Sequence, residues 1–183
     1  MNKNKLSEKA HANAVEKGFW RERKGNEHCL MLVVTEIAEM VEADRKSKTA
    51  EPIERFNWFE DWDKGTTSSD RFNFENYFKN TLEDEFADVA IRLGDLAGAL
   101  GVDFGKMQPC RYYRAFDRFS FTENAFALVK GLSKDRIAIE KRIQFGLVYI
   151  EDWAKQLGVN LDWHIEQKMK YNQGREAMHG KKY

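Results

Sequence analysis

Two acidic segments decide the fold of this chain: Thr35-Glu36-Ile37-Ala38-Glu39 and, further along, Glu83-Asp84-Glu85-Phe86-Ala87-Asp88. In each segment two carboxylates stand three residues apart, so they project from one face of a helix. Apolar residues flank both pairs on the same side, which places the carboxylates at the edge of an apolar stripe. A carboxylate buried there needs a compensating cation, and no Lys or Arg interrupts either pair. The four groups therefore predict a bound divalent metal, and oxygen ligands alone favour Mg²⁺ or Mn²⁺ over Zn²⁺.

The composition limits the class of protein. The chain has 183 residues, enough for one compact domain, and its 30 Lys+Arg balance its 30 Asp+Glu. A net charge of zero gives no reason to expect binding to nucleic acid or to an anionic membrane. No apolar run approaches the roughly 20 residues of a membrane-spanning helix. Only Cys29 and Cys110 are present, which argues against a disulfide framework, and we expect a cytoplasmic protein.

The scarcity of proline predicts an all-α protein. Pro52 and Pro109 are the only two prolines, so long stretches are free to be helical. Residues 48–73 form a long connection, and its aromatic residues, among them Trp58 and Trp62, predict an ordered loop that packs against the protein. Apolar periodicity and terminal signals predict helices over residues 6–18, 28–47, 74–100, 122–132, 134–157 and 161–177.

An internal similarity suggests how the chain is organised. Leu100-Gly101-Val102-Asp103 resembles Leu157-Gly158-Val159-Asn160, and each segment closes an apolar helix. Removing residues 104–160 would join the third predicted helix directly to the last one. We therefore predict one all-helical domain over residues 1–183, with insertions at 48–73 and 104–160, the second of them a helical pair.

The acidic segments resemble a known family. Glu36-x-x-Glu39 followed by Glu85-x-x-Asp88 is similar to the metal-binding signature of the MazG-like all-α nucleoside triphosphate pyrophosphohydrolases. The segments 48–73 and 104–160 depart from the family pattern, but they do not touch the predicted ligands. The similarity covers roughly the first third, the middle helix and the last helix, through residues 14–20, 35–45, 84–93, 168–175 and 179–183.

The resemblance implies a function and a set of ligands. It implies hydrolysis of a nucleoside triphosphate to the monophosphate and pyrophosphate, with Mg²⁺ as cofactor and Mn²⁺ as a substitute. Glu36, Glu39, Glu85 and Asp88 would be the metal ligands. Glu36 or Glu39 would also orient or deprotonate the attacking water.

Five further residues are expected to contact the nucleotide. Lys168, Asn172 and Arg175 fall at i, i+4 and i+7, on one face of the last predicted helix. The lysine and the arginine can clamp phosphates, while Asn172 can donate a directional hydrogen bond. The resemblance also implies that the segment before the first acidic pair binds the base, which singles out His11 and Trp20.

Two other interpretations stay open. Glu8-x-x-His11 and Glu176-x-x-His179 have the Glu-x-x-His spacing of di-iron helical bundles, although both motifs are terminal and polar. The second alternative is a nucleotide-binding or helical interaction protein that does not cleave its ligand. The set of four carboxylates speaks against it, because binding alone needs no water-activating metal.

The apolar stripes also bear on assembly. Two ligand helices and a last helix leave much apolar surface for so polar a chain, so we expect a homodimer or a higher even oligomer with its site near a subunit interface. The segment 104–160 could instead supply the missing helices within one chain.

Overall fold

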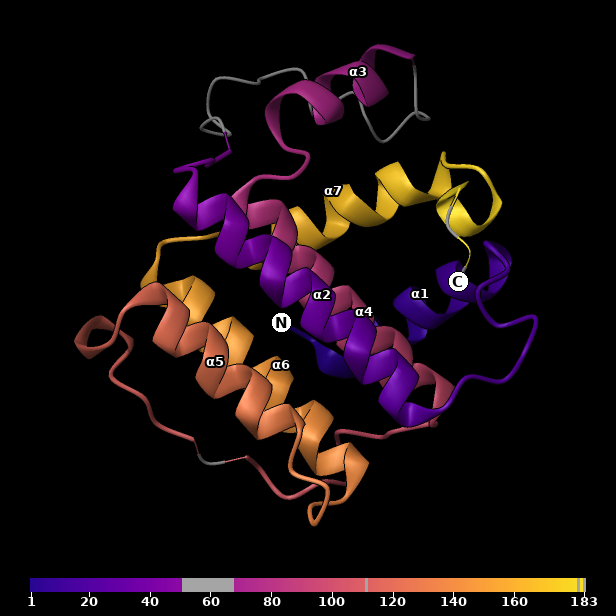
Figure 1. Ribbon diagram of the computed structural model, residues 1–183. Coiled ribbons are helices and arrows are strands. Elements are labelled where there is room, and N and C mark those ends of the chain that lie inside the picture. Colours follow the sequence, from indigo (N-terminus) through magenta and orange to yellow (C-terminus); the bar gives the residue numbers. More distant parts are fainter. Residues whose placement is uncertain (51–67, 111, 181, 183) are drawn as a thin grey trace.

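The computed structural model describes residues 1–50, 68–110, 112–180 and 182, and its regular structure is helical (Figure 1). No strand occurs in these ranges, so the prediction of an all-α helical bundle is confirmed. No helix of the described ranges is long and apolar enough to cross a membrane. The helices are α1 (Lys3–Glu16), α2 (Asn26–Arg45), α3 (Ser68–Tyr77), α4 (Leu82–Ala99), α5 (Phe121–Leu132), α6 (Ile139–Gln156) and α7 (Leu161–Gln173), with short 3-10 helices η3 (Phe116–Arg118) and η4 (Ala177–Gly180).

Helix α4 lies at the centre of the bundle. It packs against α1, α2, α6 and α7, and most of its surface is therefore buried. Large apolar side chains such as Phe86 and Leu93 fill one part of this surface, and small residues such as Ala87 and Ala97 allow close approach elsewhere. Its first turn also buries Asp84 and Glu85, so the central helix brings two carboxyl groups into the interior.

Two glycines bring α1 close to α4. A Cβ atom added at Gly98 would lie 2.5 Å from Cβ of His11 and 2.6 Å from the backbone oxygen of Ser7. A Cβ atom at Gly94 would lie 2.9 Å from Cγ of Leu6. Because Gly94 and Gly98 have no side chains, the backbone of α1 packs closely against α4, and this contact fixes the position of His11.

Helices α5 and α6 form the predicted helical pair, and they belong to the same core as the other helices. In Figure 1 the pair lies beside α2 and α4, on the side away from α1 and α7. Trp153 of α6 is fully buried, with its ring centroid 5.2 Å from that of Phe86 on α4 and 4.5 Å from that of Phe121 on α5. The segment 104–160 thus contributes core residues to a single apolar cluster.

The third predicted helix, 74–100, is wrong in its extent, because the structure divides it into α3 and α4. Asn80 adopts φ +57° between them, and Thr81 then caps α4 by accepting a hydrogen bond from the backbone N–H of Asp84. Helix α3 begins at Ser68, inside the connection predicted at 48–73. Phe74 of α3 stacks on Tyr171 of α7 with ring centroids 4.5 Å apart.

The remaining helix boundaries differ from prediction by a few residues. Helix α6 begins at Ile139 instead of residue 134, and α7 ends at Gln173 instead of residue 177. The Lys17 ammonium donates to the carbonyl oxygens of Gln173 and Arg175, which satisfies the end of α7. Trp58 and Trp62 of the predicted aromatic loop lie outside the described residues.

Candidate metal centre

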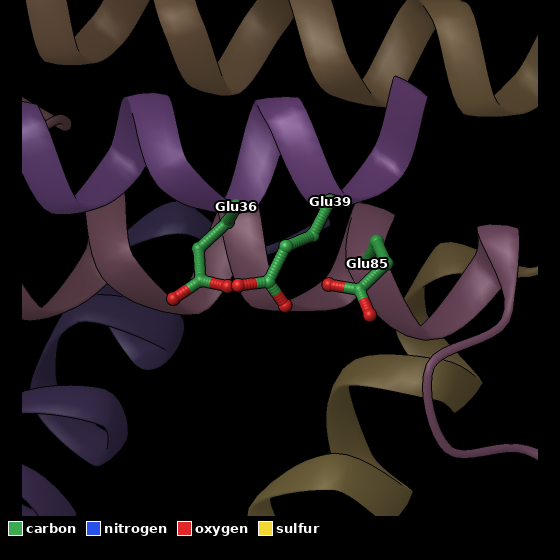
Figure 2. Close-up of side chains that lie close together, drawn as sticks. All are labelled: Glu36, Glu39 and Glu85. Atoms are coloured by element: carbon green, nitrogen blue, oxygen red, sulfur yellow. The ribbon is translucent and has the colours of Figure 1, made fainter. Parts of the chain in front are cut away.

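Three of the four predicted ligands come together between α2 and α4. One carboxylate oxygen from each of Glu36, Glu39 and Glu85 lies within 4.8 Å of the other two. Figure 2 shows the three carboxylates in a row, with Glu36 and Glu39 from α2 and Glu85 from α4. Glu36 and Glu85 are buried and Glu39 is exposed, so the group is open to solvent at one member only.

The environment of the Glu85 side chain indicates that the three-carboxylate group fits a cation. Its side chain is almost fully buried, and its Oε2 atom has no hydrogen-bond partner among the described residues. Burial, together with the negative charges of Asp88 and Asp84, raises the pKa of Glu85 to about 9. An unpartnered buried carboxylate oxygen beside two other carboxylates is the donor set that a divalent cation would complete.

Glu36 is held by a cation from the neighbouring helix. Nε of Arg92 donates to Oε1 of Glu36 at 3.0 Å. Burial and the charge of Asp88 still raise the pKa of Glu36, although Arg92 opposes them. Arg92 therefore fixes one oxygen of Glu36 and leaves the other available to a ligand.

Asp88, the fourth predicted ligand, is bonded to Lys168. The Lys168 ammonium lies 2.7 Å from Oδ2 of Asp88 and 2.6 Å from Oδ2 of Asp84, and its side chain is 7% exposed. Burial alone would lower the pKa of Lys168, but the charges of Asp88 and Asp84 outweigh it and raise that pKa. Burial likewise raises the pKa of Asp84 to about 6 against the opposing effect of Lys168.

Two basic side chains from outside the acidic segments neutralise part of this negative charge. Arg92 lies one turn beyond Asp88 on α4, and Lys168 comes from α7, 84 residues away from Asp84 in sequence. Both cations reach the carboxylates only through the packing of helices, so neither interrupts the acidic segments in sequence. Asp88 still lies close enough to the three carboxylates that its negative charge raises the pKa of Glu36 and of Glu85.

A cavity of about 200 Å³ adjoins this centre. Helices α1, α2, α4 and α7 all contribute to its lining. Its volume lies below the roughly 300–1,000 Å³ of common ligand pockets, so a nucleotide would extend past its rim. Acidic and basic side chains both line the cavity. The acidic ones are Glu36, Glu39, Asp88 and Asp95, and the basic ones are Lys79, Arg92, Lys168 and Arg175.

The three residues predicted on the last helix all line this cavity. Lys168 and Asn172 lie on α7, whereas Arg175 follows the end of that helix. Asn172 is buried, and its Oδ1 atom has no hydrogen-bond partner among the described residues. The guanidinium of Arg175 lies 5.7 Å from the ring centroid of Tyr171.

His11 and Trp20, predicted to bind the base, meet at one carboxylate. Nε1 of Trp20 donates to Oδ1 of Asp95 at 2.8 Å, and Nδ1 of His11 lies 2.9 Å from the same oxygen. Burial raises the pKa of Asp95, although the hydrogen bonds of His11 and Trp20 lower it. Neither His11 nor Trp20 lines the cavity beside the carboxylates, whereas Asp95 does.

The di-iron alternative gains no support from the described residues. Glu8 is exposed on α1, and His11 is engaged with Asp95. Glu36, Glu39 and Glu85 form the one group of potential metal ligands found in the described ranges, and it contains neither Glu8 nor Glu176. The side chain of His179 lies outside the described part of the chain.

Sequence reasoning missed Asp84, Arg92 and Asp95 as members of the site. Helical spacing offered one signal, since Asp84, Asp88, Arg92 and Asp95 recur three or four residues apart on α4. Which of these would face α1, α2 or α7 depends on the packing of α4 inside the bundle. Comparison of the chain with protein-family models, curated proteins and solved structures finds no match.

Proposed function

We propose that the protein hydrolyses a (deoxy)nucleoside triphosphate to the monophosphate and pyrophosphate in a Mg²⁺-dependent reaction. The observation that carries this proposal is the buried, unpartnered Oε2 of Glu85 beside Glu36 and Glu39. A divalent cation satisfies this oxygen, and the adjoining cavity offers cations to a polyphosphate. The resemblance of the acidic segments to the MazG-like pyrophosphohydrolases supports the same reaction.

Glu36, Glu39 and Glu85 would hold the metal, and Asp88 would join them when Lys168 turns away from it. Bound there, Mg²⁺ would lower the pKa of a water ligand and offset negative charge on the phosphate oxygens. Glu39 is the exposed member of the group, which suits it to orient or deprotonate the attacking water. Arg92 keeps Glu36 in position through its 3.0 Å hydrogen bond.

The cationic side chains of the cavity would bind the phosphates. Lys168 lies on α7 and Arg175 lies two residues past its end, and both line the cavity at separate points. This arrangement suits contacts to the distal phosphates as a leaving unit, so we favour cleavage between the α- and β-phosphates. Asn172 lies between them in sequence and lines the same cavity.

A coupled phosphate assay tests the reaction. A panel of nucleotides is incubated with Mg²⁺, and phosphate is measured before and after addition of inorganic pyrophosphatase. Signal that appears only after pyrophosphatase is expected, and Glu36→Gln should abolish it while the exposed Glu8→Gln should not. Equal signal without pyrophosphatase would place cleavage at the γ-phosphate.

A protein that binds nucleotides without cleaving them is the second candidate. The ion pairs of Lys168 with Asp84 and Asp88 favour it, because they neutralise acidic groups without a metal. In that case the assay gives no signal with any nucleotide, while calorimetry still detects nucleotide binding.

The homodimer or higher even oligomer stays a prediction. Light scattering tests it against the monomer mass of 21.5 kDa.

A further inference from the structure

Asp95 is held by two donors on a single oxygen. Trp20 Nε1 can only donate, and it lies 2.8 Å from Oδ1 of Asp95. Nδ1 of His11 lies 2.9 Å from the same atom and donates when it carries the ring hydrogen. The His11 and Trp20 rings also contact each other edge to face, with centroids 5.2 Å apart. The orientation of the carboxylate is therefore fixed from one side.

The other carboxylate oxygen of Asp95 remains available. No described residue forms a hydrogen bond with Oδ2 of Asp95, whose side chain is 16% exposed. Asp95 lines the 200 Å³ cavity, whereas His11 and Trp20 line a separate hollow near Leu96 and Leu100. Asp95 thus contacts both rings and also lines the cavity, whereas the rings themselves do not line it.

The surroundings of Asp95 suit a base more than a phosphate. Ala10, Ala14, Phe19 and Ile91 line the same cavity and provide apolar surface. Asp88 and Asp95 are seven residues apart on α4, or about 10 Å along the helix. This places Asp95 roughly one nucleoside away from Asp88, and a carboxylate repels phosphate.

We propose that Asp95 selects nucleotides whose base carries an exocyclic amino group, and that His11 and Trp20 are positioning residues for this carboxylate. The proposal rests on the function proposed above. An ionised carboxylate only accepts hydrogen bonds, so it favours the amino group of cytosine or adenine over the carbonyl oxygen of uracil or hypoxanthine. A carbonyl oxygen in that place would face Oδ2 of Asp95 with no hydrogen between them.

Matched nucleotide pairs test this selection. The substrates are dCTP against dUTP and dATP against dITP, which differ at the exocyclic group, and kcat/KM is measured for each. A hydrogen bond to a charged group corresponds to a preference of about 10- to 100-fold for the amino member of each pair. Ratios near one in the unchanged protein would overturn the proposal.

Asp95→Asn gives a sharper result, because it should invert the preference. The donors of Trp20 and His11 require an acceptor in front of them, so the oxygen of the substituted amide must face the rings. Its NH₂ group then points into the cavity and favours the carbonyl of dUTP and dITP. We expect both ratios to fall below one, while Asp152→Asn on the exposed side of α6 leaves them unchanged. An unaltered ratio in Asp95→Asn would contradict the proposed role.

Trp20→Phe tests the positioning role without changing Asp95. It removes one donor and keeps an aromatic ring, so the dCTP to dUTP ratio of kcat/KM should shrink, mainly through a higher KM for dCTP. If no nucleotide is hydrolysed, the proposed function fails, and calorimetry with dCMP and dUMP then decides the role of Asp95. The role of Asp95 is supported if the unchanged protein prefers dCMP and Asp95→Asn prefers dUMP. It is refuted if the unchanged protein binds both equally or binds neither.

Discussion

Replacing Glu85 by Gln should stabilise the metal-free protein. The pKa of Glu85 is raised from 4.5 to about 9 in the fold. Between these values the folded state binds a proton that the unfolded chain has released, so stability falls as the pH rises. At pH 7 the folded Glu85 keeps its proton, whereas the unfolded chain has lost it. Between pH 4.5 and pH 7 this difference lowers the unfolding free energy by about 3 kcal/mol, at ~1.4 kcal/mol per pH unit. Gln has nearly the same shape and does not titrate, so it avoids this penalty.

Urea unfolding in EDTA measures the effect at pH 5, 7 and 9. The unfolding free energy of Glu85→Gln should exceed that of the unchanged protein by up to about 3 kcal/mol at pH 7. This gain should be smaller at pH 5 and larger at pH 9. Glu8→Gln is the matched control, because Glu8 is exposed on α1. A Glu85→Gln variant that is no more stable than the unchanged protein, or whose gain does not grow with pH, would refute a raised pKa at Glu85.

Two further substitutions probe the packing around the site. Lys168→Met leaves Asp84 and Asp88 without their shared cation, and unfolding free energy should drop by about 3–5 kcal/mol at pH 7. The drop should be smaller at pH 5, where Asp84, with its pKa of about 6, takes up a proton; a loss independent of pH would contradict this assignment. Gly98→Ala should cost about 1–3 kcal/mol in thermal unfolding, since the new Cβ would overlap His11 and the backbone of Ser7. An unchanged Tm would show that α1 shifts freely.

The sequence predicts the helices that carry the site because their patterns are local. Glu36 and Glu39 stand three residues apart, and so do Glu85 and Asp88, so helical geometry alone aligns each pair. The break before α4 was also readable, because Thr81 followed by Asp84 three residues later is a capping pattern at a helix start. Phe74, Phe78 and Leu82 are spaced four residues apart and continue the helical apolar stripe across the break, which concealed it.

The partners of these carboxylates depend on tertiary packing instead. Lys168 reaches Asp84 and Asp88 only because α7 lies against α4. Asp95 meets His11 because Gly98 lets α1 approach α4 closely, and it meets Trp20 from the turn that follows α1. No spacing within one segment encodes a contact between helices, so the sequence identified the acidic candidates and Lys168 but not the ion pairs between them.

Direct measurement of Mn²⁺ binding tests the central claim, that Glu36, Glu39 and Glu85 form a divalent-metal centre. Free Mn²⁺ gives an electron paramagnetic resonance signal that is lost on binding, so titration counts bound ions without requiring catalysis. The unchanged protein and Glu8→Gln should bind Mn²⁺ and release it to excess Mg²⁺. The triple Gln variant of the three glutamates, if folded by circular dichroism, should leave the signal of free Mn²⁺ intact. Undiminished binding by the triple variant, or no binding by the unchanged protein at millimolar Mn²⁺, would contradict the metal centre.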